Sequence, residues 1–304
     1  MNTTGMLTRR AALGLGLVGA AGLVAGCGAM ETSGAPVPTS GPPAPPTTPE
    51  STPPPSPTPT PTPTRASNSE IIAAASVPVL CYHQVRPYES GDTEYNRQLL
   101  VIEPARYHEQ IDAMKDAGFT TIDPADYEAY LTMGTPLPDK PVLLTFDDGK
   151  DNQPGAALPA LIDRGMKGTW FIMTVVIGNS GWTTKEQVRE MADEGIVIGS
   201  HTWDHHDVRK YAGDDFTTQF VESRATLQEL SGQAVDTFAY PYGAWNTAAL
   251  PPLDEAGYTT AFQLDEKPLD PDRPLLTLRR SLAVSSWSGD QVVEKLTELS
   301  KSSA

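Results

Sequence analysis

The chain has 304 residues, two cysteines and a formal net charge of −16. Two cysteines exclude a framework of several disulfides. The acidic balance argues against a nucleic-acid partner, because phosphate backbones select basic surfaces. Residues 71–304 are numerous enough to bury one sizeable core, which predicts a single barrel or α/β domain.

Residues 1–26 have the layout of a secretory signal peptide. Arg9 and Arg10 precede an apolar run at residues 11–25, which is too short for a comfortable membrane span. Residues 24–27 resemble a bacterial lipobox, so we expect lipid on Cys27 and a lipoprotein anchored to the cell membrane, outside the cytoplasm. An ordinary cleaved signal is the alternative. Arg9 and Arg10 also partly resemble a twin-arginine export signal.

Residues 27–70 are expected to form a lipid-anchored linker. The composition changes there to Pro, Thr, Ser and Gly, and Pro alternates with Thr over residues 57–64. Such a segment has too little apolar surface to fold, and its prolines favour an extended polyproline II spacer. A glycosylated or disordered stalk is compatible with the same composition.

Short apolar runs then alternate with amphipathic stretches. Strands are expected at residues 77–82, 119–122, 142–146, 169–174, 196–200, 237–240 and 259–263. Helices are expected at residues 104–117, 124–132, 155–164, 184–194, 215–230 and 247–256. Gly118, Gly165, Gly195 and Gly257 fall where helices should stop, as a left-handed C-cap requires. The alternation predicts a parallel sheet closed, or nearly closed, into an α/β barrel, with a doubly wound open sheet as the alternative.

Two adjacent carboxylates, Asp147 and Asp148, follow the apolar run at residues 142–144. Side by side at the end of a buried strand, they would repel each other and lose hydration unless a cation or a proton compensates. The functional interpretation is that one binds a metal ion, while the other stays off the metal and serves as a base. A solvated Asp-Asp-Gly turn is the alternative.

His201 and His205 follow the predicted strand at residues 196–200. Histidines four residues apart share one face if the segment turns helically, so both imidazoles can reach one ion. With Asp148 they would form a two-histidine, one-carboxylate site for Zn²⁺ or for Co²⁺, Ni²⁺ or Fe²⁺. A chance polar loop is the alternative, and His206 is expected to face elsewhere.

A third cluster, at residues 238–243, also lies at the end of a predicted strand. Pro241 and Gly243 would form a tight turn that aims backbone N–H groups, as a site for an oxyanion needs. The same residue types also form plain turns.

In this order, Thr-Phe-Asp-Asp-Gly, His-Thr-x-x-His and the Pro-Tyr-Gly turn resemble the motifs of the NodB-like polysaccharide deacetylases, carbohydrate esterase family 4. The resemblance covers most of the globular part and implies a distorted (β/α) barrel and metal-assisted deacetylation. It implies Asp147 as catalytic base. It implies Asp148, His201 and His205 as metal ligands, with Zn²⁺ first among the candidate ions. It also implies the backbone N–H of Tyr242 as a donor to the oxyanion.

The chain departs from this family pattern at two positions. Ala239 stands where most members have the arginine that orients the base, so we expect Arg279 or Arg280 to supply that charge from another strand. No histidine follows His206, where members usually carry the general acid. The Tyr-His pair ending at His83 resembles the poly-β-1,6-N-acetylglucosamine deacetylase branch, which implies His83 as general acid. A strand-end histidine with one hydrogen bond is the alternative for His83.

The resemblance implies a hydrolase that removes N-acetyl groups from a cell-surface or environmental N-acetylglucosamine polymer and releases acetate. We expect a monomer whose partners are the polysaccharide and, through Cys27, the membrane. An O-acetyl esterase of the xylan type would use the same residues. A noncatalytic glycan-binding lipoprotein is a further alternative, which the missing arginine and late histidine favour and the retained Asp147 opposes.

Four aromatic residues near strand ends are candidates for stacking on sugar faces, with burial in the core as the alternative. They are Trp182, Trp203, Tyr240 and Trp245. Cys81 lies in an apolar run and is expected to be a small core residue. Residues 86–101 predict a long polar loop able to wall one side of a groove.

Overall fold

A computed structural model describes residues 41, 64–264 and 267–301 of the chain. The expected signal peptide, Cys27 and most of the expected linker lie outside these residues. The chain divides into two units, Met1–Pro59 and Thr60–Ala304, and the architecture belongs to the second. Among the described residues, no helix is long and apolar enough to cross a membrane.

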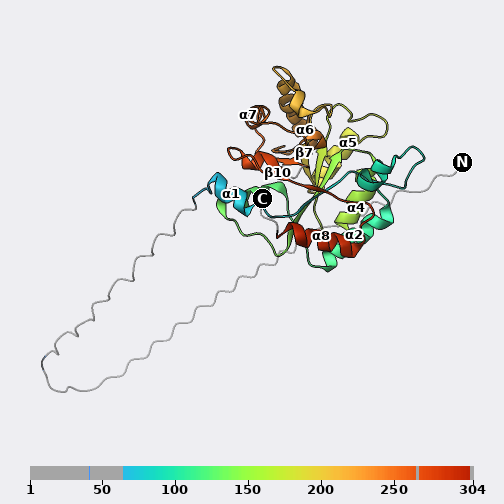
Figure 1. Cartoon of the computed structure of the whole chain (residues 1–304), viewed down its shortest axis with the longest axis horizontal. Helices are drawn as coiled ribbons and strands as arrows, with labels where there is room; N and C mark the ends of the chain where they lie inside the picture. The colour runs from blue at the N-terminus through green and yellow to red at the C-terminus, as the bar shows by residue number, and fades with distance from the viewer. Residues whose placement is uncertain (1–40, 42–63, 265–266, 302–304) are drawn as a thin grey trace, which may run out of the picture. The chain divides into compact units, whose positions relative to one another are not determined.

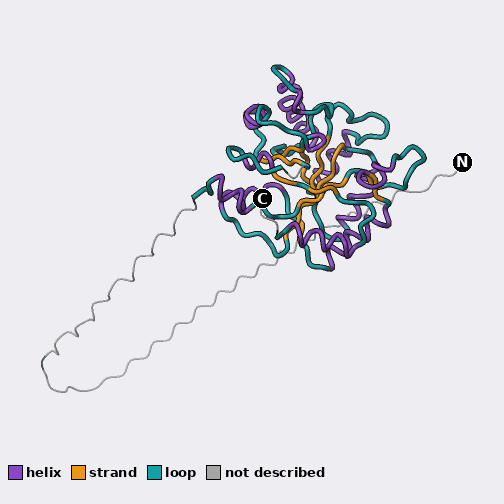
Figure 2. The backbone as a smooth tube through the Cα atoms, viewed as in Figure 1, coloured by secondary structure: helices purple, strands orange, loops and turns teal. Residues whose placement is uncertain are grey.

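The centre of the domain is a sheet whose strands all pair in parallel (Figure 2). Its strand order is β10-β9-β8-β7-β6-β5-β1-β11, with the short β4 added beside β5. The strands are β1 (Val79–Tyr82), β4 (Thr120–Thr121), β5 (Pro141–Asp148), β6 (Thr169–Ile172), β7 (Val197–Ser200), β8 (Thr237–Ala239), β9 (Thr260–Gln263), β10 (Leu278–Arg279) and β11 (Ser281–Leu282).

One short stretch of chain nearly closes this sheet into a barrel. β10 pairs with β9 at one end of the strand order, and β11 pairs with β1 at the other. β10 and β11 are consecutive in the chain and are separated by Arg280 alone. The predicted α/β barrel is therefore confirmed, and the sheet is not the open doubly wound alternative.

Helices cover the outside of the sheet (Figure 1). α2, α4 and α8 lie together on one side, and α5 and α6 lie side by side on another. α5 begins after Thr184, which forms a capping box with Gln187 and so satisfies backbone N–H groups of the first turn. The helices are α1 (Asn68–Ala74), α2 (Pro104–Asp116), α3 (Pro124–Met133), α4 (Leu158–Ile162), α5 (Lys185–Asp193), α6 (Ser223–Ser231), α7 (Leu250–Glu255) and α8 (Gly289–Leu299).

Strand alternation decides which side chains point into the barrel. On β5, Val142, Leu144 and Phe146 pack against the helices, whereas Leu143 packs in the barrel interior. Successive strand residues face opposite sides of a sheet, so Asp147 shares the interior face with Leu143. The same alternation places Cys81 and His83 with Val79, and Arg280 with Leu278, in the interior. Polar groups from distant parts of the sequence are therefore collected at one end of the barrel.

The expected strands and helices are present, with shifts at their ends. The expected helix at residues 155–164 begins as a π-helical turn, Gln153–Ala157, and the one at residues 215–230 begins as Thr217–Glu222. All four C-cap glycines have positive φ, from 65° at Gly165 to 91° at Gly257. The expected domain boundary at residue 71 falls inside α1.

Several short elements were not predicted from the sequence. Within the expected loop at residues 86–101, a π-helical turn ends against β3, and β3 pairs with β2. The helices α1 and α8 and the strands β10 and β11 were also missed. β10 and β11 have two residues each, too few to show a period. The remaining elements are β2 (Gln84–Val85), β3 (Val101–Ile102), the π-helical turn Asn96–Leu100, and the 3-10 turns Val208–Lys210, Pro241–Gly243 and Pro274–Thr277.

Candidate metal and catalytic site

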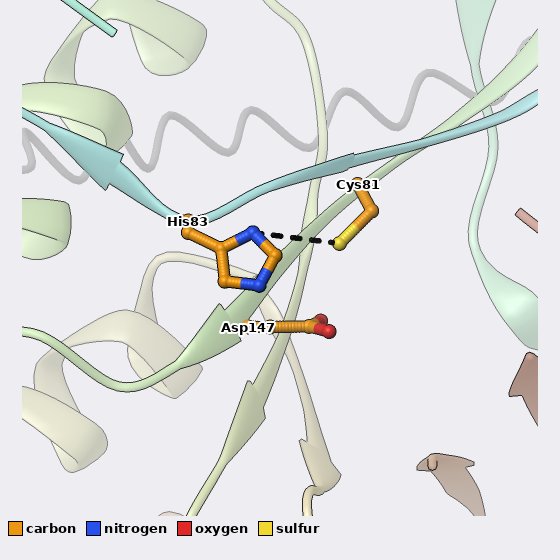
Figure 3. A group of neighbouring side chains, drawn as sticks. All are labelled: Cys81, His83 and Asp147. Atoms are coloured by element: carbon orange, nitrogen blue, oxygen red, sulfur yellow. Dashed lines mark hydrogen bonds between the residues drawn. The ribbon is translucent and has the colours of Figure 1, made fainter. Parts of the chain in front are cut away.

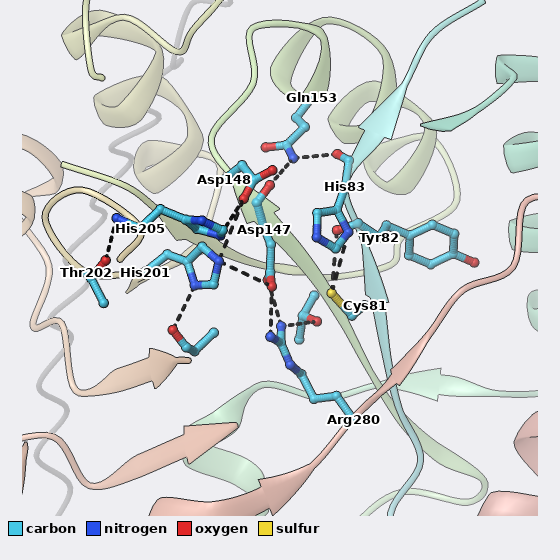
Figure 4. A network of polar contacts seen from close by, with 12 residues as sticks. Cys81, Tyr82, His83, Asp147, Asp148, Gln153, His201, Thr202, His205 and Arg280 are labelled. Atoms are coloured by element: carbon cyan, nitrogen blue, oxygen red, sulfur yellow. Dashed lines mark hydrogen bonds and ion pairs between the residues drawn. The ribbon is translucent and has the colours of Figure 1, made fainter. Parts of the chain in front are cut away.

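Asp148, His201 and His205 converge at the carboxyl ends of β5 and β7 (Figure 4). An Asp148 oxygen, Oδ1, lies 3.7 Å from His201 Nε2 and 3.5 Å from His205 Nε2. One ligand atom from each of the three residues lies within 4.8 Å of the other two. These spacings suit three ligands of one ion, because zinc–nitrogen and zinc–oxygen bonds are about 2.0–2.2 Å long.

Hydrogen bonding and burial prepare the two histidines to bind a cation. His201 Nδ1–H donates to the Ala239 carbonyl at 2.7 Å, which leaves the Nε2 lone pair facing Asp148. Burial lowers the pKa of His201 to about 4, although Asp147 opposes this effect. Burial also lowers the pKa of His205. Both rings are therefore neutral at pH 7, the form that binds metals.

Strained backbone is concentrated at this site. Five non-glycine residues in the described part of the chain have positive φ, and four belong to the site: Asp148 (79°), Thr202 (69°), His205 (64°) and Tyr242 (61°). Each such conformation costs on the order of 1 kcal/mol or more. Strain of this kind is typical of functional sites, where side-chain direction matters more than local stability.

Arg280 holds the Asp147 carboxylate with both ends of its guanidinium. Arg280 Nη1 donates to Asp147 Oδ1 at 2.7 Å, and Nη2 donates to Oδ2 at 2.8 Å. The two side chains are 0% and 1% exposed. Burial raises the pKa of Asp147, but the charge of Arg280 and its hydrogen bonds outweigh this effect and keep that pKa well below the usual range.

The expectation that Arg279 or Arg280 replaces the missing arginine is thus met by Arg280. Arg279 faces the other side of the same stretch, and its Nε donates to the Lys267 carbonyl at 3.1 Å. Ala239 contributes its carbonyl to His201 instead of a charge to Asp147.

His83 and Cys81 lie on the opposite side of Asp147 from His201 and His205 (Figure 4). Figure 3 shows His83, Cys81 and Asp147 as a group. His83 is 9% exposed, and its Nδ1 lies 3.9 Å from Cys81 Sγ. One ligand atom of each of Cys81, His83 and Asp147 lies within 4.8 Å of the others, so distance alone would allow a metal there too. The group Asp148, His201 and His205 is the better candidate for a metal site, because Arg280 already occupies both Asp147 oxygens. Burial also raises the pKa of the Cys81 thiol far above its ordinary value, which disfavours the thiolate that binds metals.

The third predicted cluster forms the 3-10 turn Pro241–Gly243 beside the metal site. The Tyr242 side chain is 68% exposed, and its ring meets the His205 ring edge to face at 4.7 Å between centroids. Gly243 has φ +66°, and a Cβ there would collide with the backbone of Leu264. The turn therefore requires glycine and carries Tyr242 to the edge of the site.

The four aromatic residues expected to stack on sugar faces or to lie in the core differ in burial. Tyr240 is fully buried and donates its hydroxyl to the Leu276 carbonyl, which excludes it as a sugar platform. Trp245 packs partly against the core and donates Nε1 to Gln263. Trp182 and Trp203 are half-buried, and Lys150 Nζ lies 3.3 Å from the centre of the Trp182 ring. His206 is exposed and pairs only with Asp204 among the ion pairs of the described residues.

One polar residue of the site was not predicted from the sequence. Gln153 is fully buried and donates to the backbone carbonyls of both His83 and Asp147. No motif or period marks it, because it is the first residue of the π-helical turn Gln153–Ala157.

The sequence model of the family described as polysaccharide deacetylase matches residues 134–261. A Bacillus subtilis (strain 168) protein, the polysaccharide deacetylase YxkH by name, is 28% identical over 215 residues, which is 71% of this chain and 74% of that protein. The peptidoglycan-N-acetylglucosamine deacetylase of Bacillus cereus is 30% identical over 46% of this chain and 50% of its own length. The poly-β-1,6-N-acetyl-D-glucosamine N-deacetylase of Staphylococcus aureus (strain MRSA252) is 27% identical over 56% of this chain and 63% of its own length. The aligned region thus spans about half to two thirds of the last two relatives.

Two solved structures are similar to the whole domain. The deacetylase PplD of Streptococcus pyogenes aligns with a TM-score of 0.67 at 24% identity, over 77% of this chain and 99% of that one. IcaB from Ammonifex degensii aligns with a TM-score of 0.59 at 27% identity, over 73% and 96% of the two chains. The fold and the convergence of Asp148, His201 and His205 define a (β/α) barrel protein with a candidate metal site at the carboxyl ends of its strands.

The chain carries a polysaccharide deacetylase domain of the NodB-like type, carbohydrate esterase family 4. It is a hydrolase of the class that acts on carbon–nitrogen bonds other than peptide bonds. The family and enzyme class predicted from the sequence are confirmed.

Proposed function

We propose that this protein removes N-acetyl groups from an N-acetylglucosamine polymer and depends on a divalent metal ion, with Zn²⁺ as the first candidate. The observation that carries the proposal is the convergence of Asp148, His201 and His205 beside a second carboxylate, Asp147, that Arg280 keeps ionised. A site that only bound a metal or a glycan would have no use for this second, buried and unliganded acid.

The donor set fits a catalytic divalent cation. Asp148 and the two neutral histidines supply one oxygen and two nitrogens, and three protein ligands leave positions open for water and substrate. A cation held there would supply Lewis acidity, polarising the acetyl carbonyl and making water a stronger acid.

Asp147 and His83 would carry out two separate proton transfers. Asp147 would accept the proton of the water that attacks the acetyl carbon, since its carboxylate is ionised at neutral pH. The Tyr242 backbone N–H would donate to the developing oxyanion, a contact typically worth about 3 kcal/mol. When the C–N bond breaks, its electron pair stays on nitrogen, and His83 would give that nitrogen a proton. The products are acetate and the free amine of the sugar.

His83 is the feature that favours an amide over an ester substrate. An amine leaves poorly unless it is protonated, whereas many alcohols and phenols need less help. A buried histidine across Asp147 from the metal ligands suits this role. Relatives that act on peptidoglycan and on poly-β-1,6-N-acetylglucosamine by name support a polymer of N-acetylglucosamine as the substrate.

We also propose that the enzyme works outside the cytoplasm, attached to the membrane through lipid on Cys27. The basis is the sequence pattern of residues 1–27 and the proline-rich segment after it. Mass spectrometry of the mature N-terminus and fractionation of a Cys27→Ala variant test this. Unlipidated wild-type protein in the soluble fraction would contradict the anchor.

The test of function is acetate release from β-1,4-linked and β-1,6-linked N-acetylglucosamine oligomers and from peptidoglycan. We expect release that a chelator abolishes and that added Zn²⁺, Co²⁺, Ni²⁺ or Fe²⁺ restores. Asp147→Asn should keep metal binding and lose at least about 100-fold in kcat. Asp151→Asn, an exposed neighbour in the following loop, is the matched control and should be active. Release that survives chelation, or release only from O-acetyl esters, would overturn the proposal.

A further inference from the structure

The pairing between β1 and β5 ends just before His83 and Asp147. β1 and β5 pair in register from Val79 opposite Leu143 to Tyr82 opposite Phe146. His83 and Asp147 are the next residues on each strand. Asp147 still pairs with β6, opposite Phe171, but no ladder contact ties His83 to β5 at this level. The separation of these two residues therefore needs another constraint.

The Gln153 side chain supplies a bridge at this point (Figure 4). Its Nε2 donates to the His83 carbonyl at 2.5 Å and to the Asp147 carbonyl at 2.6 Å. Only the NH₂ end of an amide has two donors, so the two carbonyls fix which way the side chain points. The neighbouring Asn152 accepts from the Val85 backbone N–H at 3.1 Å, which ties down the chain just beyond His83.

The side-chain oxygen of Gln153, Oε1, indicates that a contribution to stability does not by itself explain why glutamine is present at this position. It is buried and has no hydrogen-bond partner, a defect that costs about 1–3 kcal/mol. Gln110 shows the fully satisfied alternative in the same domain. It is equally buried and donates to the Val284 and Trp287 carbonyls, while its oxygen accepts from the Tyr82 hydroxyl.

We propose that Gln153, with Asn152 beside it, is a positioning residue that sets the distance between the acid His83 and the base Asp147. The inference rests on the roles given to those two residues under the proposed function. Where the pairing of β1 with β5 has ended, the Gln153 amide links the two backbones instead. It thereby holds the proton donor His83 and the proton acceptor Asp147 at a set spacing on either side of the scissile bond. A misplacement of about 1 Å can cost about 100-fold in rate.

The test compares Gln153→Met with Gln110→Met. Each change removes two donations to backbone carbonyls from a fully buried side chain. Gln110→Met also leaves the buried Tyr82 hydroxyl without its acceptor, so Gln110→Met should lower stability at least as much as Gln153→Met. For Gln153→Met we expect kcat on an N-acetylglucosamine oligomer to fall about 10-fold to 100-fold, with KM within about twofold. Hydrolysis of 4-nitrophenyl acetate should fall less than about threefold, because nitrophenolate leaves without a proton. Gln110→Met should keep the wild-type ratio of amide to ester rates.

Equal losses on amide and ester, or an unchanged amide kcat, would overturn the inference. If Gln153→Met does not fold, Asn152→Ala carries the same measurement at a half-buried position, with an expected fall in the amide-to-ester ratio of about threefold to tenfold. An unchanged ratio in that variant also overturns it. A wild-type enzyme without activity on any amide would instead contradict the proposed function, so the two failures are distinguishable.

Discussion

Replacing Arg280 with methionine would remove the partner of a buried carboxylate while keeping most of the side-chain volume. Two hydrogen bonds of 2.7 and 2.8 Å join the pair, and neither side chain is exposed to solvent by more than 1%. Breaking a buried ion pair from one side typically costs about 3–5 kcal/mol, because the remaining charge stays buried without compensation. We therefore expect Arg280→Met to lose about 3 kcal/mol of unfolding free energy at pH 7.

The loss should depend on pH in a direction set by Asp147. In the wild type its pKa lies below the ordinary value of 3.8, so the pair stabilises the fold above about pH 4, and this stabilisation is lost as the pH falls through the folded-state pKa. Without Arg280, burial dominates and raises the pKa of Asp147. In the variant, Asp147 therefore binds a proton more readily in the folded state than in the unfolded state, and folding takes up a proton as the pH falls. The stability difference between the two proteins should therefore be largest at neutral pH and shrink toward pH 4.

Urea unfolding at pH 5 and pH 7 measures this difference, and the pH profile of kcat/KM reports the base. The acid limb of the profile should move to higher pH by more than about one unit in Arg280→Met. Arg279→Met, one residue away on the other face of the same stretch, should leave that limb in place. An unchanged acid limb in Arg280→Met, with stability equally reduced at both pH values, would refute the reasoning.

Three further predictions concern the site and its support. His83→Ala should lower amide kcat by about 100-fold or more but 4-nitrophenyl acetate hydrolysis by less than about tenfold, and equal losses would remove His83 as the acid. His205→Gln should weaken Zn²⁺ binding by more than about 100-fold in calorimetry, while the exposed neighbour change His206→Gln should not, and retained affinity in His205→Gln would exclude that ligand. Gly149→Ala should destabilise by about 2–4 kcal/mol in urea, because φ is +81° and an added Cβ would lie 2.8 Å from a β6 methyl group. Gly118→Ala, with similar φ and open space, should lose only about 1 kcal/mol, and equal losses would show that the contact is unimportant.

The sequence alone predicted that Asp148, His201 and His205 lie together, because strand periodicity and motif position carry that information locally. Asp148 and His201 each follow an apolar run, and the carboxyl ends of parallel strands meet at one end of a barrel. The sequence therefore predicted that these two residues converge with His205. The left-handed backbone at Asp148 and His205 was not, because neither residue type demands positive φ.

Tertiary structure alone decided between Arg279 and Arg280. Adjacent strand residues face opposite sides, and two-residue strands have no period from which their faces can be read. Arg280 reaches Asp147 from 133 positions along the chain, because the stretch that carries it closes the barrel between β9 and β1. Gln153 was invisible for the same reason: its partners are two backbone carbonyls, and backbone position depends on the packing of the whole barrel.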